Sequence, residues 1–215
     1  MLNFSAIEIR VMGCLLEKQL ATPDYYPMTE NALVNAANQK SSRDPVMALQ
    51  AEEVGAALGE LSRKEFVEQV KVSGSRSFKF RQQLAQRWRI SDVEAETERD
   101  VLAVLAVLAL RGPQTLGQIR QRTERMFFFP DIEHVQRVVE QLMVETEDRP
   151  ALVVEDHSIA GRDVRYTHLL GDSATAPMAA PPVVAPSDDT SLIARVEALE
   201  SEVAALRAMI EELTS

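Results

Sequence analysis

Residues 70–81 have the sequence VKVSGSRSFKFR, and this stretch decides the fold prediction. In 70–72 and again in 78–81, apolar residues alternate with basic ones, which is typical of two strands that each bury one face. The polar residues SGSRS between them are suited to a turn. We therefore predict a β-hairpin with a basic outward face made by Lys71, Lys79 and Arg81, with Arg76 at the tip.

Three segments with helical periodicity come before the hairpin, at about 5–19, 30–38 and 50–64. The first begins with the capping box SAIE, and the two prolines of TPDYYP end it. Thr29 is suited to cap the second helix. The third helix carries Val54, Leu58 and Leu61 on one face. Three helices followed by a hairpin is the element order of a winged-helix domain.

The second half of the chain repeats this order. An apolar helix is centred on 101–110, a capping box at Thr115 opens a short helix to about Arg125, and a third helix follows Pro130. The segments ALVVED and RDVRYTHLL then predict two strands.

The two halves also agree in residue spacing. Pro27-Met28-Thr29 with Leu33 matches Pro113-Gln114-Thr115 with Ile119, and Val54, Leu58 and Leu61 match Val135, Val139 and Leu142. We therefore predict a mainly α, α+β protein with small β-hairpins, built from two tandem winged-helix domains at 1–88 and 89–170.

The last part of the chain differs in composition from the repeats. Residues 171–189 are rich in Pro and Ala, which indicates a semi-extended linker. In 190–215 valine and isoleucine fill the a positions of a heptad and leucine the d positions, which favours a parallel two-stranded coiled coil and a homodimer. The alternative is an amphipathic helix that folds back on the body. The heptad residues are Leu192, Val196, Leu199, Val203, Leu206, Ile210 and Leu213.

Charge is distributed unevenly along the chain, whose formal net charge is −10. Residues 1–90 contain 12 Lys and Arg against 10 Asp and Glu, a net charge of +2. Residues 91–215 contain 11 against 23, a net charge of −12. A negative net charge generally counts against nucleic-acid binding. The local excess of cations around the hairpin is nevertheless compatible with such binding.

The sequence contains no pattern that we associate with catalysis, a cofactor or a metal. The three histidines have no Cys or carboxylate at ligand spacing, and the glycines are scattered singly. Cys14 lies within a helix among apolar residues, where a buried and inert thiol is expected. No apolar run is long enough to cross a membrane, and the N-terminus does not resemble a signal peptide. We expect a cytoplasmic protein without enzymatic activity.

Several long strings in this sequence resemble one bacterial family. They are IEIRVMGCLLEKQLATPDYYPMTENALVNAANQKSSRDPVM at 7–47, EEVGAALGEL at 52–61 and RGPQTLGQIRQRTERM at 111–126. All three closely resemble the YceH-like family, and the resemblance covers about residues 4–170. It implies a pair of winged-helix domains. Because that family is largely uncharacterised, the resemblance implies no substrate, catalytic residue or cofactor.

Two main functions remain open from the sequence, besides an enzyme with a site between the repeats, for which Tyr25 and Tyr26 are the first residues to examine. The first is association with double-stranded DNA, with Lys40 and Arg43 adding phosphate contacts to the four cations of the hairpin. Acidic third helices argue against base recognition, since Glu52, Glu53 and Glu60 oppose phosphate. The second is a protein-interaction scaffold with Phe127, Phe128 or Phe129 as an anchor, next to the cations Arg120, Arg122 and Arg125.

Overall fold

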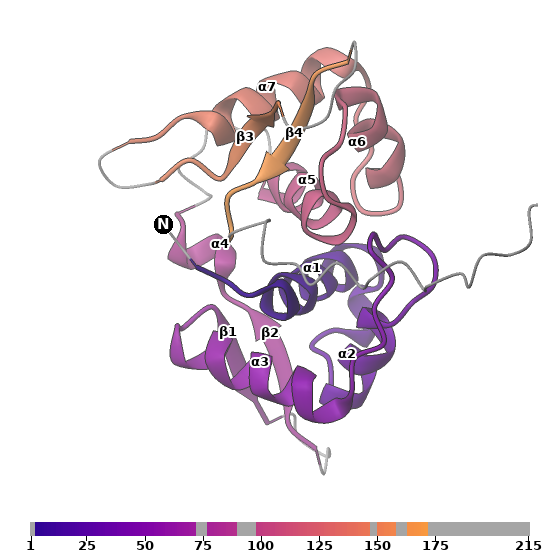
Figure 1. Ribbon diagram of the computed structural model, residues 1–215, viewed down its shortest axis with the longest axis vertical. Helices are drawn as coiled ribbons and strands as arrows, with labels where there is room; N and C mark the ends of the chain where they lie inside the picture. Colours follow the sequence, from indigo (N-terminus) through magenta and orange to yellow (C-terminus); the bar gives the residue numbers. More distant parts are fainter. Residues whose placement is uncertain (1–2, 72–76, 90–97, 147–149, 158–162, 172–215) are drawn as a thin grey trace, which may run out of the picture. The chain divides into compact units, whose positions relative to one another are not determined.

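The computed structural model describes residues 3–71, 77–89, 98–146, 150–157 and 163–171. The chain divides into two compact units, 1–177 and 178–215, and every described residue lies in the first unit. The predicted linker and coiled-coil helix therefore lie outside the described residues. Figure 1 shows the described elements, which form two successive repeats within this unit.

The elements of the first repeat are three main helices, a hairpin and two short helical turns. Their bounds are α1 Ala6–Ala21, η1 Pro23–Tyr25, α2 Glu30–Ala37, α3 Ala51–Arg63, β1 Val67–Val70, β2 Lys79–Gln82 and α4 Leu84–Arg87. Both predicted caps are present: Ser5 and Glu8 form a capping box at α1, and Thr29 Oγ1 accepts from the Ala32 amide at α2.

The second repeat has the same order without the short helical turns. Its elements are α5 Glu98–Arg111, α6 Leu116–Thr123, α7 Ile132–Met143, β3 Val153–Asp156 and β4 Arg165–His168. The predicted capping box at Thr115 is present, with Gln118 as its second member. At α7 the side chain of Asp131 accepts from the His134 amide.

The two hairpins are antiparallel and each gains a third short segment. Val67 pairs with Gln82 and Val70 with Lys79 in β1–β2, and Val153 pairs with His168 in β3–β4. In the first repeat, Met28 before α2 forms a bridge with Phe80. In the second repeat, Gln114 before α6 forms the equivalent bridge with Tyr166. The spacing that relates Met28 to Gln114 in the sequence therefore has a structural counterpart.

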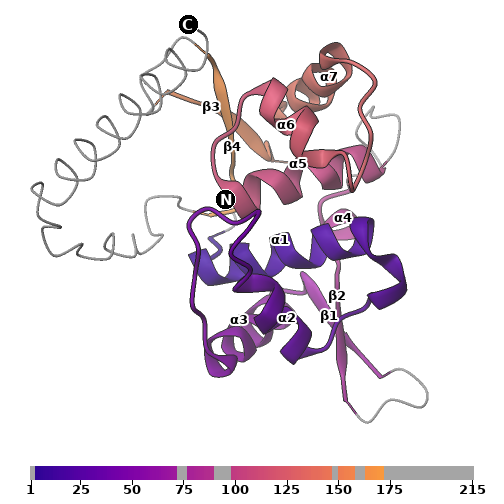
Figure 2. The ribbon, with the colours of Figure 1, turned by 90° about the vertical axis from the view of Figure 1, so that its right-hand side faces the viewer.

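Helices α1 and α5 lie side by side in the middle of this unit, with one hairpin on each side (Figures 1 and 2). Residues 101–110 of α5 are all buried, because a helix that is apolar on every side needs to be covered on every side. The two helices cross at Gly13, where an added Cβ would lie 2.9 Å from the Leu110 side chain. A glycine is therefore what allows the two repeats to approach this closely.

Two further contacts close the junction between the repeats. The Asp44 amide donates to the carbonyl of Leu110 at 2.8 Å, and the Phe4 amide donates to the carbonyl of Leu170 at 3.1 Å. Phe4 is buried, and its ring meets the Phe66 ring edge-on with centroids 5.1 Å apart. The beginning and the end of the described body thus lie together.

The mixed α+β class is confirmed, but the first hairpin strand begins earlier than expected. The alternation at 70–72 predicts a strand there, whereas β1 covers Val67–Val70 and Lys71 lies beyond its end. The physical reason is burial: Phe66 and Val67 enter the core directly after α3. Glu65, with φ of 62°, reverses the chain between helix and strand.

None of the described helices is long and apolar enough to span a membrane. A cytoplasmic location remains a prediction from the sequence.

The crossing at Gly13 gives a prediction about stability. Gly13→Leu should lower the free energy of unfolding by about 2–3 kcal/mol, because the new side chain meets Leu110 and Ala109 in a packed interface. Chemical denaturation at pH 7 measures this change.

Gly59→Ala on α3 is the matched control, because no atom lies within 4 Å of its added Cβ. This variant should be more stable than the native protein by about 0.5–1 kcal/mol through helix propensity. Equal stability changes in the two variants would show that Gly13 is not a packing constraint.

Candidate functional site

Arg43, predicted to contact phosphate, has a different place in the structure. Its side chain is buried, with 6% of the residue exposed, and Nε donates to the carbonyl of Ala36 at 3.0 Å. Nη1 and Nη2 donate to the two carboxylate oxygens of Glu17 at 3.1 and 2.7 Å. A guanidinium held in this bidentate way binds α1 to the loop before α3, and is not free to contact DNA.

Glu17 is the centre of this arrangement. Its carboxylate also lies 3.1 Å from the Lys18 ammonium. Burial opposes ionisation of Glu17, but the hydrogen bonds and charge of Arg43 outweigh burial and hold its pKa below the ordinary value. The carboxylate of Glu17 therefore already pairs with two cations, Arg43 and Lys18.

The predicted basic face of the hairpin is only partly present. Lys79 and Arg81 share one face as the alternation predicts, but Arg81 lies 2.7 Å from the Glu68 carboxylate on the paired strand. Lys71 is exposed beyond the end of β1, and the register pairs Val70 with Lys79. Arg76 lies outside the described residues.

A basic groove of about 810 Å³ lies between the two repeats, and the sequence does not predict it. It is lined by the second half of α1, the loop after α2, the end of α5 and residues 122, 125 and 126. Five of the lining side chains are cations and one is a carboxylate, the already paired Glu17. The cations are Lys18, Lys40, Arg111, Arg122 and Arg125.

Two cations of the basic groove have neutral partners, and a third, Lys18, pairs with Glu17. Arg111 Nη2 donates to Ser42 Oγ at 2.6 Å, and Arg122 Nη1 donates to Gln114 Oε1. Burial and, next, the nearby charge of Arg122 lower the pKa of Arg111. Cations that repel one another across a groove are stabilised by an anion that bridges them, and phosphate groups meet this requirement.

The three consecutive phenylalanines separate into two that pack and one that does not. Phe129 is buried and Phe127 partly buried, and both meet the buried His134 ring edge-on. His134 Nε2 in turn lies 3.4 Å from Asp100 Oδ2 on α5. Phe128 remains 68% exposed. Arg120 donates to the carbonyls of Phe129 and Pro130 and so fixes this loop.

The seven predicted heptad residues, Leu192 to Leu213, lie outside the described residues. Cys14 is fully buried, and burial raises the pKa of its thiol to about 11, so that it stays protonated at neutral pH. Within the described residues, no group of three or more His, Cys, Asp or Glu is arranged to hold a metal ion.

The body that carries the basic groove matches one family model almost throughout. Residues 4–162 match the family described as protein of unknown function, DUF480. The chain belongs to the DUF480 family. This assignment confirms the uncharacterised bacterial family that the sequence resembles, and the match includes the first repeat and the second repeat of this DUF480 protein as far as β3.

Relatives of this DUF480 protein are similar along almost the whole chain. A UPF0502 protein of Geobacter sulfurreducens is 46% identical over 204 residues, which cover 93% of this chain and 88% of the relative. A UPF0502 protein of Klebsiella pneumoniae is 40% identical, with 98% and 96% covered. One of Mesorhizobium japonicum is 43% identical, with 97% and 95% covered.

The Glu17–Arg43 pair gives a second prediction. Glu17→Gln should lower the free energy of unfolding at pH 7 by about 2 kcal/mol, since it leaves the buried Arg43 without its counter-charge. Because the folded-state pKa of Glu17 is lowered, the stabilisation is present above the ordinary pKa of 4.5 and is lost as pH falls below it.

Denaturation curves of both proteins between pH 7 and pH 3.5 measure this difference. The difference in the free energy of unfolding between the native protein and Glu17→Gln should become smaller as the pH is lowered. If this difference stays constant over the pH range, the ion pair between Glu17 and Arg43 is not the cause of the lost stability.

Proposed function

We propose that this protein consists of two winged-helix domains and binds duplex DNA through phosphate contacts, as a non-enzymatic, DNA-associated regulator. The observation that carries this proposal is the convergence of five cations from both repeats on the basic groove. The one carboxylate, Glu17, is paired with Arg43 and with Lys18 of these five.

The winged-helix assignment is supported by the order of elements in each repeat. A helix is followed by a short bridging segment, two helices and a hairpin, and the bridging segment joins the second hairpin strand in both repeats. This is the arrangement in which a winged helix places its wing beside the third helix. The inference from fold to DNA is an analogy, so the argument for binding depends on the charges of the groove.

The third helices support binding that depends little on base sequence. The exposed residues of α3 include Glu52, Glu53 and Glu60, and Glu60 pairs with Arg63. Carboxylates on this face oppose entry into the major groove beside phosphate. The basic groove would therefore hold the DNA backbone, with Lys71 and Lys79 of the hairpin as secondary contacts.

The proposal includes a homodimer formed by residues 190–215. Its support is the heptad pattern, with Val196, Val203 and Ile210 at a and leucines at d. Two copies would bring two basic grooves to one DNA molecule.

The basic groove predicts a specific pattern of DNA binding. The native protein should bind mixed-sequence duplex with a slope of log K against log salt of about −4, as expected for four to five phosphate contacts. Lys40→Glu with Arg125→Glu should weaken binding at least 30-fold and reduce the slope by about 2, since two phosphate contacts are lost. Fluorescence anisotropy at several salt concentrations measures both quantities.

Lys71→Glu with Lys79→Glu is the matched variant, because it changes the net charge of the protein by the same amount. It should weaken binding less than 5-fold. An absence of binding by the native protein at low salt would refute the proposal. A larger loss in the hairpin variant than in the groove variant would move the binding surface to the hairpin.

A protein-interaction scaffold is the second candidate, and the exposure of Phe128 favours it. The two neighbouring phenylalanines are held in place by His134 and the loop by Arg120, so Phe128 projects from a fixed turn. A rigid exposed aromatic side chain next to cations is typical of an anchor for an acidic partner.

Phe128→Ser distinguishes this candidate. Proteins that co-purify with the native chain through this surface should be lost from the Phe128→Ser variant and retained by Tyr25→Ser, whose side chain is also exposed but lies in the other repeat. Quantitative mass spectrometry of the three purifications gives the comparison. Identical sets of co-purifying proteins would rule out Phe128 as an anchor.

A further inference from the structure

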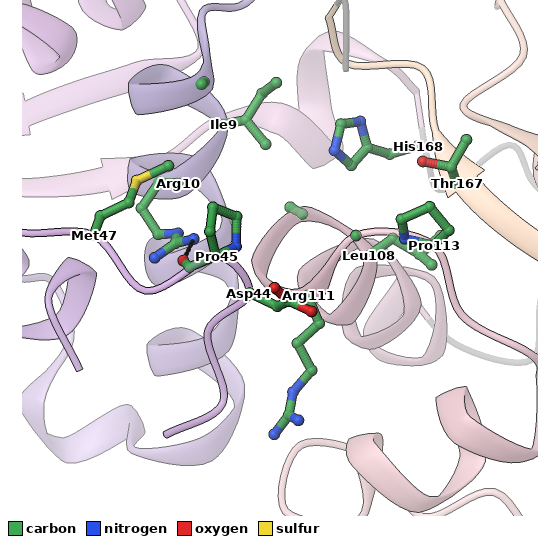
Figure 3. Close-up of a pocket in the computed structure, with 13 residues that line it drawn as sticks. Ile9, Arg10, Asp44, Pro45, Met47, Leu108, Arg111, Pro113, Thr167 and His168 are labelled. Carbon is green, nitrogen blue, oxygen red and sulfur yellow. Dashed lines mark hydrogen bonds between the residues drawn. The ribbon is translucent and has the colours of Figure 1, made fainter. Parts of the chain in front are cut away.

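A second cavity lies at the junction of the repeats, where the first half of α1 meets the end of α5 (Figure 3). Its volume is about 260 Å³, and its lining comes from both repeats. The cavity is lined by residues near the start of α1 and the basic groove by residues near its end, with the crossing at Gly13 between them in the sequence. We call it the junction cavity.

Most of the lining of the junction cavity is apolar. Ile9 on α1 and Leu108 on α5 lie on it together with Pro45 and Pro113 (Figure 3). Apolar side chains from three separate segments favour a compact apolar group, because water at such a surface is readily displaced.

Arg10 supplies a buried positive charge to the junction cavity. The residue is 2% exposed, Nη1 donates to the carbonyl of Ala37 at 3.1 Å and Nη2 to that of Pro45 at 2.6 Å. Its Nε has no acceptor among the described residues. No described carboxylate forms an ion pair with it, but the charge of Asp44, which also lines the cavity, acts on it from farther away. Burial lowers the pKa of Arg10. A buried cation that is paired only with carbonyls is stabilised by an anion nearby.

His168 adds a neutral donor on another side of the junction cavity (Figure 3). Burial lowers the pKa of His168 to about 4, so the ring is uncharged at neutral pH. Nδ1 accepts from the Leu170 amide at 3.4 Å, which leaves the proton on Nε2. The cavity therefore combines an apolar lining, the buried cation Arg10, the neutral N–H donor of His168 and one carboxylate, Asp44. With Arg111 included, the lining carries two cations and one anion, a net charge of +1, which one carboxylate ligand would neutralise.

We propose that the junction cavity binds a small monocarboxylate with a compact apolar body, whose carboxylate is recognised by Arg10 and His168. Such a ligand contacts both repeats at once and stabilises their packing across α1 and α5. Arg111 contributes to the junction cavity and to the basic groove, and its guanidinium points away from the other cavity residues (Figure 3). Insofar as the basic groove binds DNA, which is the proposed function, occupancy of the cavity changes that affinity through Arg111.

Benzoate and hexanoate, each compared with its neutral amide, are the probes that test this proposal. Titration of the full-length protein without DNA, followed by isothermal calorimetry and amide chemical shifts, should show saturable binding of at least one carboxylate. The corresponding amide should bind at least 10-fold more weakly. Equal binding of acid and amide, or no binding of either acid, would overturn the proposal.

Three variants locate the site. Ala6→Leu fills the cavity from the first turn of α1 and should abolish binding, whereas Ala56→Leu on the exposed face of α3 should leave it unchanged. His168→Phe retains an aromatic ring without its donor and should reduce the preference for acid over amide at least 3-fold. Thermal unfolding confirms that each variant is folded. Binding that persists in Ala6→Leu would place the site elsewhere.

The titration is independent of DNA, so the two proposals fail separately. A protein that binds the carboxylate but no duplex would refute the proposed function and keep the ligand site. A protein that binds duplex but neither carboxylate would refute the ligand site and leave the proposed function standing.

Discussion

The packing of α1 against α5 is the constraint on which the described body depends. Each helix is apolar around most of its circumference and neither can be covered by its own repeat alone. Gly13 has no side chain to hold the helices apart, and the Leu110 side chain lies where a Cβ at position 13 would be in close contact. Along α1, Gly13 lies between the residues that line the junction cavity and those that line the basic groove.

Glu17 decides which cations of the junction are available to a ligand. It satisfies Arg43 from both carboxylate oxygens and Lys18 as well, and one carboxylate cannot neutralise a third or fourth cation. Lys40 and Arg125 therefore remain without a carboxylate partner among the described residues. The basic groove is therefore positive, although the chain as a whole is strongly acidic.

Local features of this fold could be predicted from the sequence, and contacts between distant segments could not. The helix caps at Ser5, Thr29 and Thr115 were predictable because the cap and its amide lie three residues apart. The role of Arg43 was not, because its partner Glu17 lies 26 residues away on another helix. The basic groove could not be predicted because it forms only when α1 packs against α5. The early start of β1 depends on the burial of Phe66 and Val67, which the hydrophobic periodicity of the sequence does not indicate.

The contact between Phe4 and Leu170 has a consequence for synthesis. The Phe4 amide finds its acceptor 166 residues later in the chain, and Gly171 lies so close that an added Cβ would be 2.1 Å from the Phe4 carbonyl oxygen. A ribosome therefore has to complete both repeats before Phe4, the first buried residue among those described, makes its last native contact. Until then the Phe4 amide lacks its native acceptor, and the N-terminal segment is held only by its contacts with the first repeat.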